Sequence, residues 1–158
     1  MKHFGAIERF LNPSPFIGQG FALGDISVTA ASVVPGPGAP TQTGIFGETV
    51  TAGQLLYKDA SNSNKLMKAS TLNSATAECV GVSLDGGAAG QPGTYQTSGE
   101  YTVGGTCAIG VAYGVSDTAG AIALVADNGT GDFGTIFGIG RSTTKINIGI
   151  NPSRGAKA

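Results

Sequence analysis

The chain has 158 residues, with 27 glycines, 7 prolines and no tryptophan, which allows one domain of ordinary size and an additional arm. Only 12% of the residues are charged and the net charge is −1, so no basic cluster exists to neutralise the phosphates of a nucleic acid. No apolar run reaches the roughly 18 residues that a membrane-spanning helix needs. Residues 1–15 lack the apolar core of a signal peptide, so we expect synthesis in the cytoplasm and no membrane partner.

Residues 1–43 are predicted to form an N-terminal arm and a linker rich in proline and glycine. One or two amphipathic helical turns are expected before Pro13, from the spacing of Phe4, Ile7, Phe10 and Leu11. So short a helix is unstable alone in water and must pack on its own domain or on a partner. Residues 25–34 alternate well enough for one strand, and residues 35–44 are expected to link without joining a core.

Residues 44–158 are predicted to form an all-β domain, a compact glycine-rich barrel or sandwich. Short apolar stretches are separated by glycines at the spacing of about 8 to 12 residues that is typical of such folds. The expected strands cover residues 45–50, 54–58, 65–69, 77–84, 93–97, 100–103, 107–115, 121–126, 134–140 and 145–150. No segment of this region has an apolar period of 3.6 residues, so helix is expected to be scarce.

The β domain also repeats part of its pattern at an offset of 57 residues, the distance from Gly47 to Gly104. Five identities occur at this offset, in which Gly47, Thr49, Gly53, Ala69 and Gly81 match Gly104, Thr106, Gly110, Ala126 and Gly138. In so glycine-rich a chain the matching apolar pattern is better evidence than these identities. An internal duplication of two β-motifs, 44–99 and 101–156, therefore stays open beside a single domain without repeats.

The two cysteines are predicted to be buried and unpaired. At the same offset Cys79 matches Ile136 and Cys107 matches Val50, which are apolar strand positions. Cysteine behaves as a small hydrophobic residue at such positions. A nucleophilic cysteine would need a base, and the only histidine, His3, is in the arm.

Catalytic and metal-binding patterns are scarce in the sequence. One histidine and two cysteines are too few for a usual zinc site. The stretch ADNGTGDFG could turn oxygens of Asp127, Asn128 and Asp132 toward calcium, but a calcium loop has denser acids and a bidentate glutamate. We interpret it as a turn in which acidic and amide side chains bind their own backbone. We therefore expect no enzymatic activity and no cofactor or metal.

The stretch GETVTAGQLLY, residues 47–57, resembles the opening of lipoyl and biotinyl carrier domains, and Met67–Lys68 resembles their modified Met-Lys pair. However, Met67 follows Gln54 by thirteen residues, farther than in those carriers. Lys68 is therefore predicted to be a strand side chain near an edge rather than the tip of a hairpin. The stretch itself is predicted to be a sharp corner at which Gly53 supplies backbone freedom.

The region from about 45 to 150 resembles the capsid decoration proteins of tailed bacteriophages. The matching positions are glycines and small or aromatic residues at strand ends: Gly81, Val82, Ser83, Ala88, Ala89, Gly90, Thr97, Gly99, Gly110, Tyr113, Gly134 and Gly138. The resemblance implies a small β-tulip-like protein that binds a finished shell from outside and bridges subunits of the major capsid protein. It also implies a homotrimer.

From this resemblance we expect a virion structural protein on the exterior of a phage head. The arm is expected to contact the coat or a sister subunit through its apolar side chains, Phe4, Ile7, Phe10, Leu11, Phe16 and Phe21. One alternative is a tail or head fibre component that anchors a receptor-binding module. The other is a carrier or enzyme-associated domain. Nucleic acid is not an expected partner.

Overall fold

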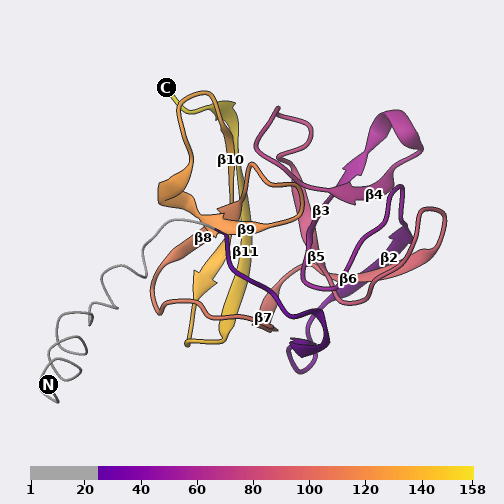
Figure 1. Cartoon of the computed structure of the whole chain (residues 1–158), viewed down its shortest axis with the longest axis horizontal. Helices are drawn as coiled ribbons and strands as arrows, with labels where there is room; N and C mark the ends of the chain where they lie inside the picture. The colour runs from indigo at the N-terminus through magenta and orange to yellow at the C-terminus, as the bar shows by residue number, and fades with distance from the viewer. Residues whose placement is uncertain (1–24) are drawn as a thin grey trace, which may run out of the picture.

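A computed structural model describes residues 25–158, which form two antiparallel β-sheets packed face to face (Figure 1). The all-β prediction is confirmed as a sandwich, whereas the barrel alternative is wrong because neither sheet closes. Sheet A has the strand order β1-β7-β11-β10-β8-β9, and sheet B has the order β2-β6-β5-β3-β4. In Figure 1, sheet A lies on the left and sheet B on the right.

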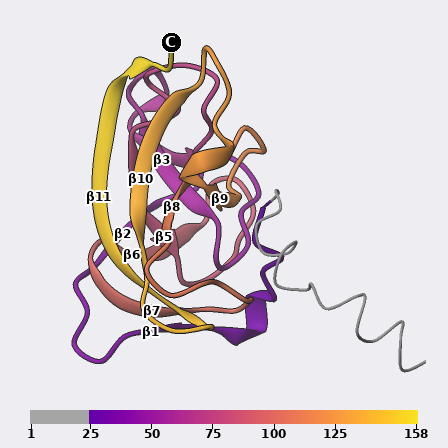
Figure 2. The ribbon, with the colours of Figure 1, turned by 90° about the vertical axis from the view of Figure 1, so that its left-hand side faces the viewer.

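The strands are short except in the C-terminal hairpin. Sheet B contains β2 (Thr41–Ile45), β3 (Leu55–Asp59), β4 (Lys65–Lys68), β5 (Cys79–Ser83) and β6 (Pro92–Gln96). Sheet A contains β1 (Val33–Pro35), β7 (Gly99–Val103), β8 (Ala112–Val115), β9 (Ile122–Leu124), β10 (Phe133–Gly140) and β11 (Lys145–Ala156). Three single-turn 3-10 helices connect them: η2 (Ala30–Ser32), η3 (Ala60–Asn62) and η4 (Val125–Asp127). The strands β10 and β11 run side by side along one side of the molecule (Figure 2).

The two sheets have the same strand order once β1 is set aside. Moving each strand of sheet B forward by five strands converts the order β2-β6-β5-β3-β4 into β7-β11-β10-β8-β9, which is sheet A. We call β2–β6 the first repeat and β7–β11 the second repeat. A duplication of two β-motifs would produce this order, although β2 begins at Thr41 and β7 at Gly99, before the starts of 44–99 and 101–156.

The register of the pairing between β3 and β5 recurs between β8 and β10. Leu56 pairs with Gly81 in sheet B, and Tyr113 pairs with Gly138 in sheet A, so both partners are displaced by 57 residues. A bulge follows this pair in both sheets. The turn before β3 is equivalent to the turn before β8, because Gly53 N donates to Ser83 O and the residues 57 positions later, Gly110 N and Gly140 O, make the same bond.

The corner at Gly53 has the conformation that the sequence predicts. Its φ is +88°, and the equivalent Gly110 has a φ of +76°. A side chain at Gly53 would also meet Val28, whose Cγ1 would lie 2.5 Å from an added Cβ. Glycine is therefore required there both for the left-handed backbone and for the close packing of residues 26–33.

The two repeats bury non-equivalent faces against each other. In the first repeat Leu55 pairs with Val82, and both side chains are fully buried in the core between the sheets. The equivalent pair in the second repeat, Ala112 and Ile139, lies on the side of sheet A that faces away from sheet B, and Ile139 is 49% exposed. We call the face with Leu55 and Val82 the outer face of the first repeat and the equivalent face with Ala112 and Ile139 the outer face of the second, and the opposite face of each repeat is its inner face. The outer face of the first repeat covers the inner face of the second.

The inner face of the first repeat has a small core of its own. Its side chains are those of Phe46, Val50, Leu56, Leu66 and Tyr95, all at most 1% exposed. Phe46 and Val50 come from the segment after β2, which crosses over this face. A Cβ at Gly93 would lie 2.0 Å from Phe46, so glycine there makes room for the ring.

The described part of the expected arm and linker belongs to the sandwich. The prediction of a strand at 25–34 is wrong for residues 25–32. Their backbone hydrogen bonds do not follow one neighbouring strand, because Ile26 N donates to Ile122 O and Thr29 N donates to Gly104 O. Val33 then enters the core and begins β1, which pairs with β7. We call residues 25–35 the inserted segment, because it lies between the ends of β7 and β9.

The linker prediction for 35–44 is also incomplete, since residues 41–45 form β2 and pair with β6. Of the strand expected at 45–50, only Ile45 lies in a strand, as the last residue of β2. In the first repeat nothing is inserted between the two edge strands, because Gly47 N donates directly to Leu66 O. The inserted segment therefore distinguishes the second repeat from the first.

Candidate interaction surface

The outer face of the second repeat is the candidate interaction surface. We call it the outward face of sheet A and define it by Val34, Ala112, Ile136, Ile139, Asn147 and Asn151. These residues come from β1, β8, β10 and β11. Directly paired residues of neighbouring strands share one face of a sheet, so these side chains lie together.

The outward face is partly aliphatic and also carries Glu100 and Lys145, because Glu100 pairs with Asn147 and Lys145 pairs with Thr102, the partner of Val34. Val34 is 51% exposed and Ile139 is 49% exposed, and between them β11 presents the exposed side chain of Asn147. Alternation along β11 places Ile146 and Ile148 in the core and Asn147 outside. The surface therefore combines aliphatic side chains with amides that can both donate and accept hydrogen bonds.

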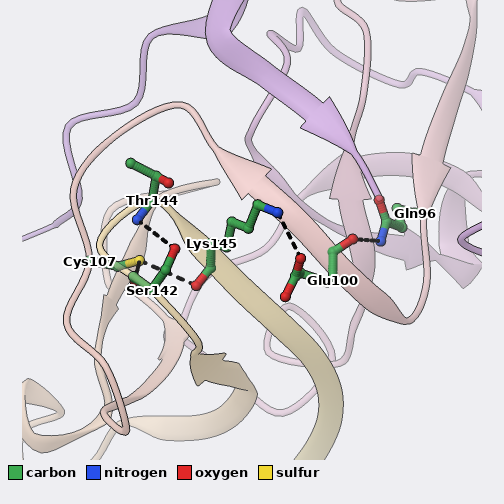
Figure 3. Close-up of polar contacts among 6 residues, drawn as sticks. All are labelled: Gln96, Glu100, Cys107, Ser142, Thr144 and Lys145. Atoms are coloured by element: carbon green, nitrogen blue, oxygen red, sulfur yellow. Dashed lines mark hydrogen bonds and ion pairs between the residues drawn. The ribbon is translucent and has the colours of Figure 1, made fainter. Parts of the chain in front are cut away.

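One ion pair lies within this face, on the two strands between β1 and β10. Lys145 Nζ is 2.9 Å from Glu100 Oε1 across the β7–β11 pairing, and both side chains are solvent-exposed (Figure 3). An exposed pair of this kind contributes only about 0 to 1 kcal/mol to folding. Its two opposite charges leave the face neutral overall.

A shallow hollow of about 220 Å³ adjoins the face. It is lined by Val125, Gly134, Thr135, Ile136 and Asn151. The neighbouring strands approach closely beside it, since a Cβ at Gly114 of β8 would lie 2.4 Å from Thr135 O of β10.

An acid-lined hollow of about 500 Å³ lies beside the first described residues. Its lining comprises Asp25, Ser116, Asp117, Ala123, Asp127, Asn128 and Asp132. Ser116 Oγ donates to Asp25 Oδ1 at 2.5 Å, and Thr118 N donates to Ser116 Oγ. These contacts fasten residue 25 to the end of β8. Among residues 25–158 no cluster of His, Cys, Asp or Glu has a metal-binding arrangement.

The ADNGTGDFG stretch is a turn, as predicted. Gly129 N donates to Asp132 Oδ2 at 2.6 Å, and Asp132 N donates to Gly129 O. Gly131 has a φ of +95°, and Lys157 Nζ donates to the carbonyl of Asn128 at 2.5 Å. The carboxylate of Asp132 thus binds its own turn, which is the interpretation the sequence favoured over a calcium loop.

Lys68 is the last residue of β4, an edge strand of sheet B, as predicted for a strand side chain near an edge. Its Nζ lies 3.2 Å from Glu48 Oε2, and its backbone N donates to Glu48 Oε1 at 2.7 Å. The turn between β3 and β4 is formed by residues 60–64. Lys68 is therefore held along the strand and not at a hairpin tip.

Both cysteines are free and buried, as predicted. Burial raises the pKa of the Cys79 thiol to about 12, and burial also raises the pKa of Cys107. Cys107 Sγ lies 3.1 Å from the carbonyl oxygen of Ser142 (Figure 3). A protonated, enclosed thiol is a packing residue and not a nucleophile.

The contact residues predicted in the arm, Phe4, Ile7, Phe10, Leu11, Phe16 and Phe21, lie outside the described residues, as does His3. The outward face was not predicted from the sequence. A signal for it was present, because the 57-residue offset aligns Val82 with Ile139. Only the observed packing shows that the first is buried and the second is not.

The comparisons with known proteins add no family to these observations. No protein-family model matches the chain, and a search of curated proteins found no match. No helix among the described residues is long and apolar enough to cross a membrane.

Proposed function

We propose that this protein is a structural component of a phage particle that decorates the outside of the capsid and bridges subunits of the major capsid protein. The observation that carries the proposal is the outward face of sheet A, where Val34 and Ile139 are about half exposed and the two charged side chains, Glu100 and Lys145, form one ion pair. The equivalent face of the first repeat is covered by another sheet, and a surface of this kind marks a contact with another macromolecule.

The composition of the chain supports the same function. Its low charge suits a surface that neighbouring subunits cover, and its tight turns and short loops make a rigid unit. A bridging protein acts through surface area and complementary shape, so it needs no catalytic group. The resemblance of residues 45–150 to decoration proteins supplies the assignment to a capsid.

In this proposal the arm supplies a second contact with the coat, in addition to the outward face. Residues 10–24, FLNPSPFIGQGFALG, contain no charged residue and carry Phe10, Phe16 and Phe21. Burial of three such side chains would contribute roughly 5 to 9 kcal/mol before ordering costs, at about 1.5 to 3 kcal/mol each. Part of this gain is lost in ordering the arm.

The test uses empty heads assembled from the major capsid protein of the same genome. Purified full-length chain should bind these heads to saturation in a sedimentation assay and raise the temperature at which they disrupt. A variant lacking residues 1–24 should bind at least about tenfold more weakly. A variant in which Leu72, an exposed loop residue of the β domain, is replaced by serine serves as a control and should bind normally.

Full-length chain that leaves the heads undecorated at micromolar concentration would contradict the proposal. Recovery of the chain from purified tails instead of heads would favour the fibre alternative. Full decoration by the truncated variant would show that the β domain, and not the arm, contacts the coat.

A further inference from the structure

We propose that Asn128 is the site of a spontaneous covalent modification, the loss of its side-chain amide, and that Asp132 and Lys157 set the rate of this reaction by holding the peptide unit between Asn128 and Gly129. This inference goes beyond the attachment to a capsid and does not depend on it. It rests on the sequence of the turn between η4 and β10 and on the contacts of that one peptide unit.

The first step is the sequence. Asn128 and Gly129 form the one Asn-Gly pair of the chain. Glycine has no Cβ, so its amide nitrogen is the least hindered one that can follow an asparagine, and its backbone turns most freely. Gly129 is exposed and Asn128 is half-buried, so water reaches both residues.

The reaction needs only these two residues and water. The backbone nitrogen of Gly129 attacks Cγ of Asn128, and a C–N bond forms there. The bond from Cγ to the side-chain nitrogen breaks, and ammonia leaves with the proton of the backbone N–H. Water then opens the five-membered imide, and the product is aspartate or isoaspartate.

The second step is the set of contacts that hold the reacting peptide unit. Gly129 N donates to Asp132 Oδ2 at 2.6 Å, and Lys157 Nζ donates to the carbonyl oxygen of Asn128 at 2.5 Å. Each contact involves a charged group, which makes it stronger than a hydrogen bond between neutral groups. Because the peptide unit is planar, its N–H and its C=O turn together, so both contacts resist the same rotation.

The third step is the conformation in which the unit is held. Asn128 has an extended backbone with a ψ of 125°. Ring closure needs the Gly129 nitrogen on the same side of the Cα–C bond as the Cβ of Asn128, and this ψ turns the nitrogen away. The rotation that brings them together breaks the contacts to Asp132 and Lys157. The folded chain therefore reacts only when this turn opens locally.

The product would change the acid-lined hollow. Asn128 lines this hollow together with Asp25, Asp117, Asp127 and Asp132. Loss of the amide adds a further carboxylate to these four, and like charges repel. Isoaspartate also lengthens the main chain by one carbon between η4 and β10. The modification is therefore expected to keep the turn open once it has occurred.

The experiment follows the full-length chain during incubation at pH 8, with peptide mapping by mass spectrometry to measure conversion at Asn128. Conversion in the native chain should be at least about tenfold slower than in the chain unfolded in urea, because only the open turn reacts. Asp132→Ala should raise the native rate by about fivefold or more, since it removes a charge-assisted contact. Gly129→Ala should suppress conversion in both states. It fits the fold, because a Cβ there would lie 3.5 Å from Asp132 Oδ2, an ordinary contact.

Asp117→Ala is the matched control, because it removes a carboxylate from the same hollow without a contact to this peptide unit. It should leave the rate at Asn128 unchanged. Conversion at Asn73, which precedes a serine, reports any general loosening and should not rise in Asp132→Ala.

Equal rates in the native and the unfolded chain would overturn the proposal, as would an unchanged rate in Asp132→Ala. An equal rise in Asp132→Ala and Asp117→Ala would also overturn it, because the charge of the hollow and not the contact would then set the rate. Binding to heads is measured separately, so failure here leaves the proposed attachment to a capsid to its own test.

Discussion

Gly81 and Gly138 occupy equivalent positions in the two repeats. At each position a side chain would collide with the backbone of the neighbouring strand. A Cβ at Gly81 would lie 2.3 Å from the carbonyl oxygen of Gln96, and a Cβ at Gly138 would lie 2.3 Å from that of Asn147. Both oxygens belong to the backbone of the next strand in the sheet, β6 or β11. The two repeats thus share a close approach of strands that only glycine permits.

Gly138→Ala is therefore expected to destabilise the protein, and Gly81→Ala by a similar amount. Moving a paired strand to admit a methyl group costs about 1 to 3 kcal/mol, as for other overpacked positions. Gly149→Ala is the control, because it lies on β11 with nothing within 4 Å of an added Cβ. Urea unfolding of the three variants measures the differences. A loss in Gly149→Ala equal to that in Gly138→Ala would show that the close approach is not the cause.

The inserted segment gives a second prediction, on truncation. Removal of residues 1–24 should leave the free energy of unfolding nearly unchanged, because all the described strands and core side chains lie within residues 25–158. Removal of residues 1–35 should cost at least about 3 kcal/mol, since it exposes the site of Val33 and deletes the bonds made by Ile26 and Thr29.

Thermal and urea unfolding of the two truncated chains checks this prediction. The arm and linker predicted from the sequence as residues 1–43 therefore cannot be removed as a whole without loss of stability. Equal stability of both truncated chains would mean that the inserted segment contributes nothing to the sandwich.

A third prediction concerns the thiols. Native protein should react very slowly with a disulfide reagent at pH 8, because both cysteines are buried and Cys79 stays protonated up to a pKa of about 12. Denatured protein should release two equivalents of the reporter group. Rapid reaction of even one thiol in the native state would contradict the buried position of that cysteine.

Stability at alkaline pH is the subject of a fourth prediction. Burial raises the pKa of Cys79 from 9.0 to about 12, and it also raises the pKa of Tyr101, Cys107, Tyr113 and Tyr57. The folded chain thus keeps protons that the unfolded chain loses above pH 9. The resulting stabilisation is complete below pH 9 and is lost as the pH rises toward 12.

Urea unfolding at intervals between pH 7 and pH 11 measures this loss. Cys79→Ala should lose less stability than the unmodified chain over the alkaline part of the range, because it lacks one of the shifted groups. Parallel curves for the two proteins would show that Cys79 makes no contribution to the pH dependence.

The sequence predicted the strands with an apolar face better than the strands without one. Residues 65–68 and 134–140 lie in strands as expected, since neighbouring sheets bury alternate side chains there. The strand β2 was missed because it is an edge strand whose side chains are mostly exposed, so it has no apolar alternation to detect. The expected strand at 107–115 is shortened to 112–115 by the turn at Gly110.

The outward face could not be derived from the pattern alone. In β10 the apolar residue Ile139 points outward while Gly138 points inward, which reverses what hydrophobicity predicts. The reversal arises because the inward position is needed for the close approach to Asn147, a contact between segments that no local pattern records. The repeat offset located the equivalent positions, but the burial of each depends on which sheet covers it.

The inserted segment also makes the two repeats inseparable during folding. Residues 25–35 precede the first repeat in the chain, yet their partners are in the second: β1 pairs with β7, and Ile26 bonds to Ile122. On the ribosome these residues emerge before both repeats and must wait for partners that emerge about 70 to 100 residues later at the rate of synthesis. The second repeat is therefore completed only after the first has been made, and a nascent chain that ends after residue 98 would hold a strand with nothing to pair with.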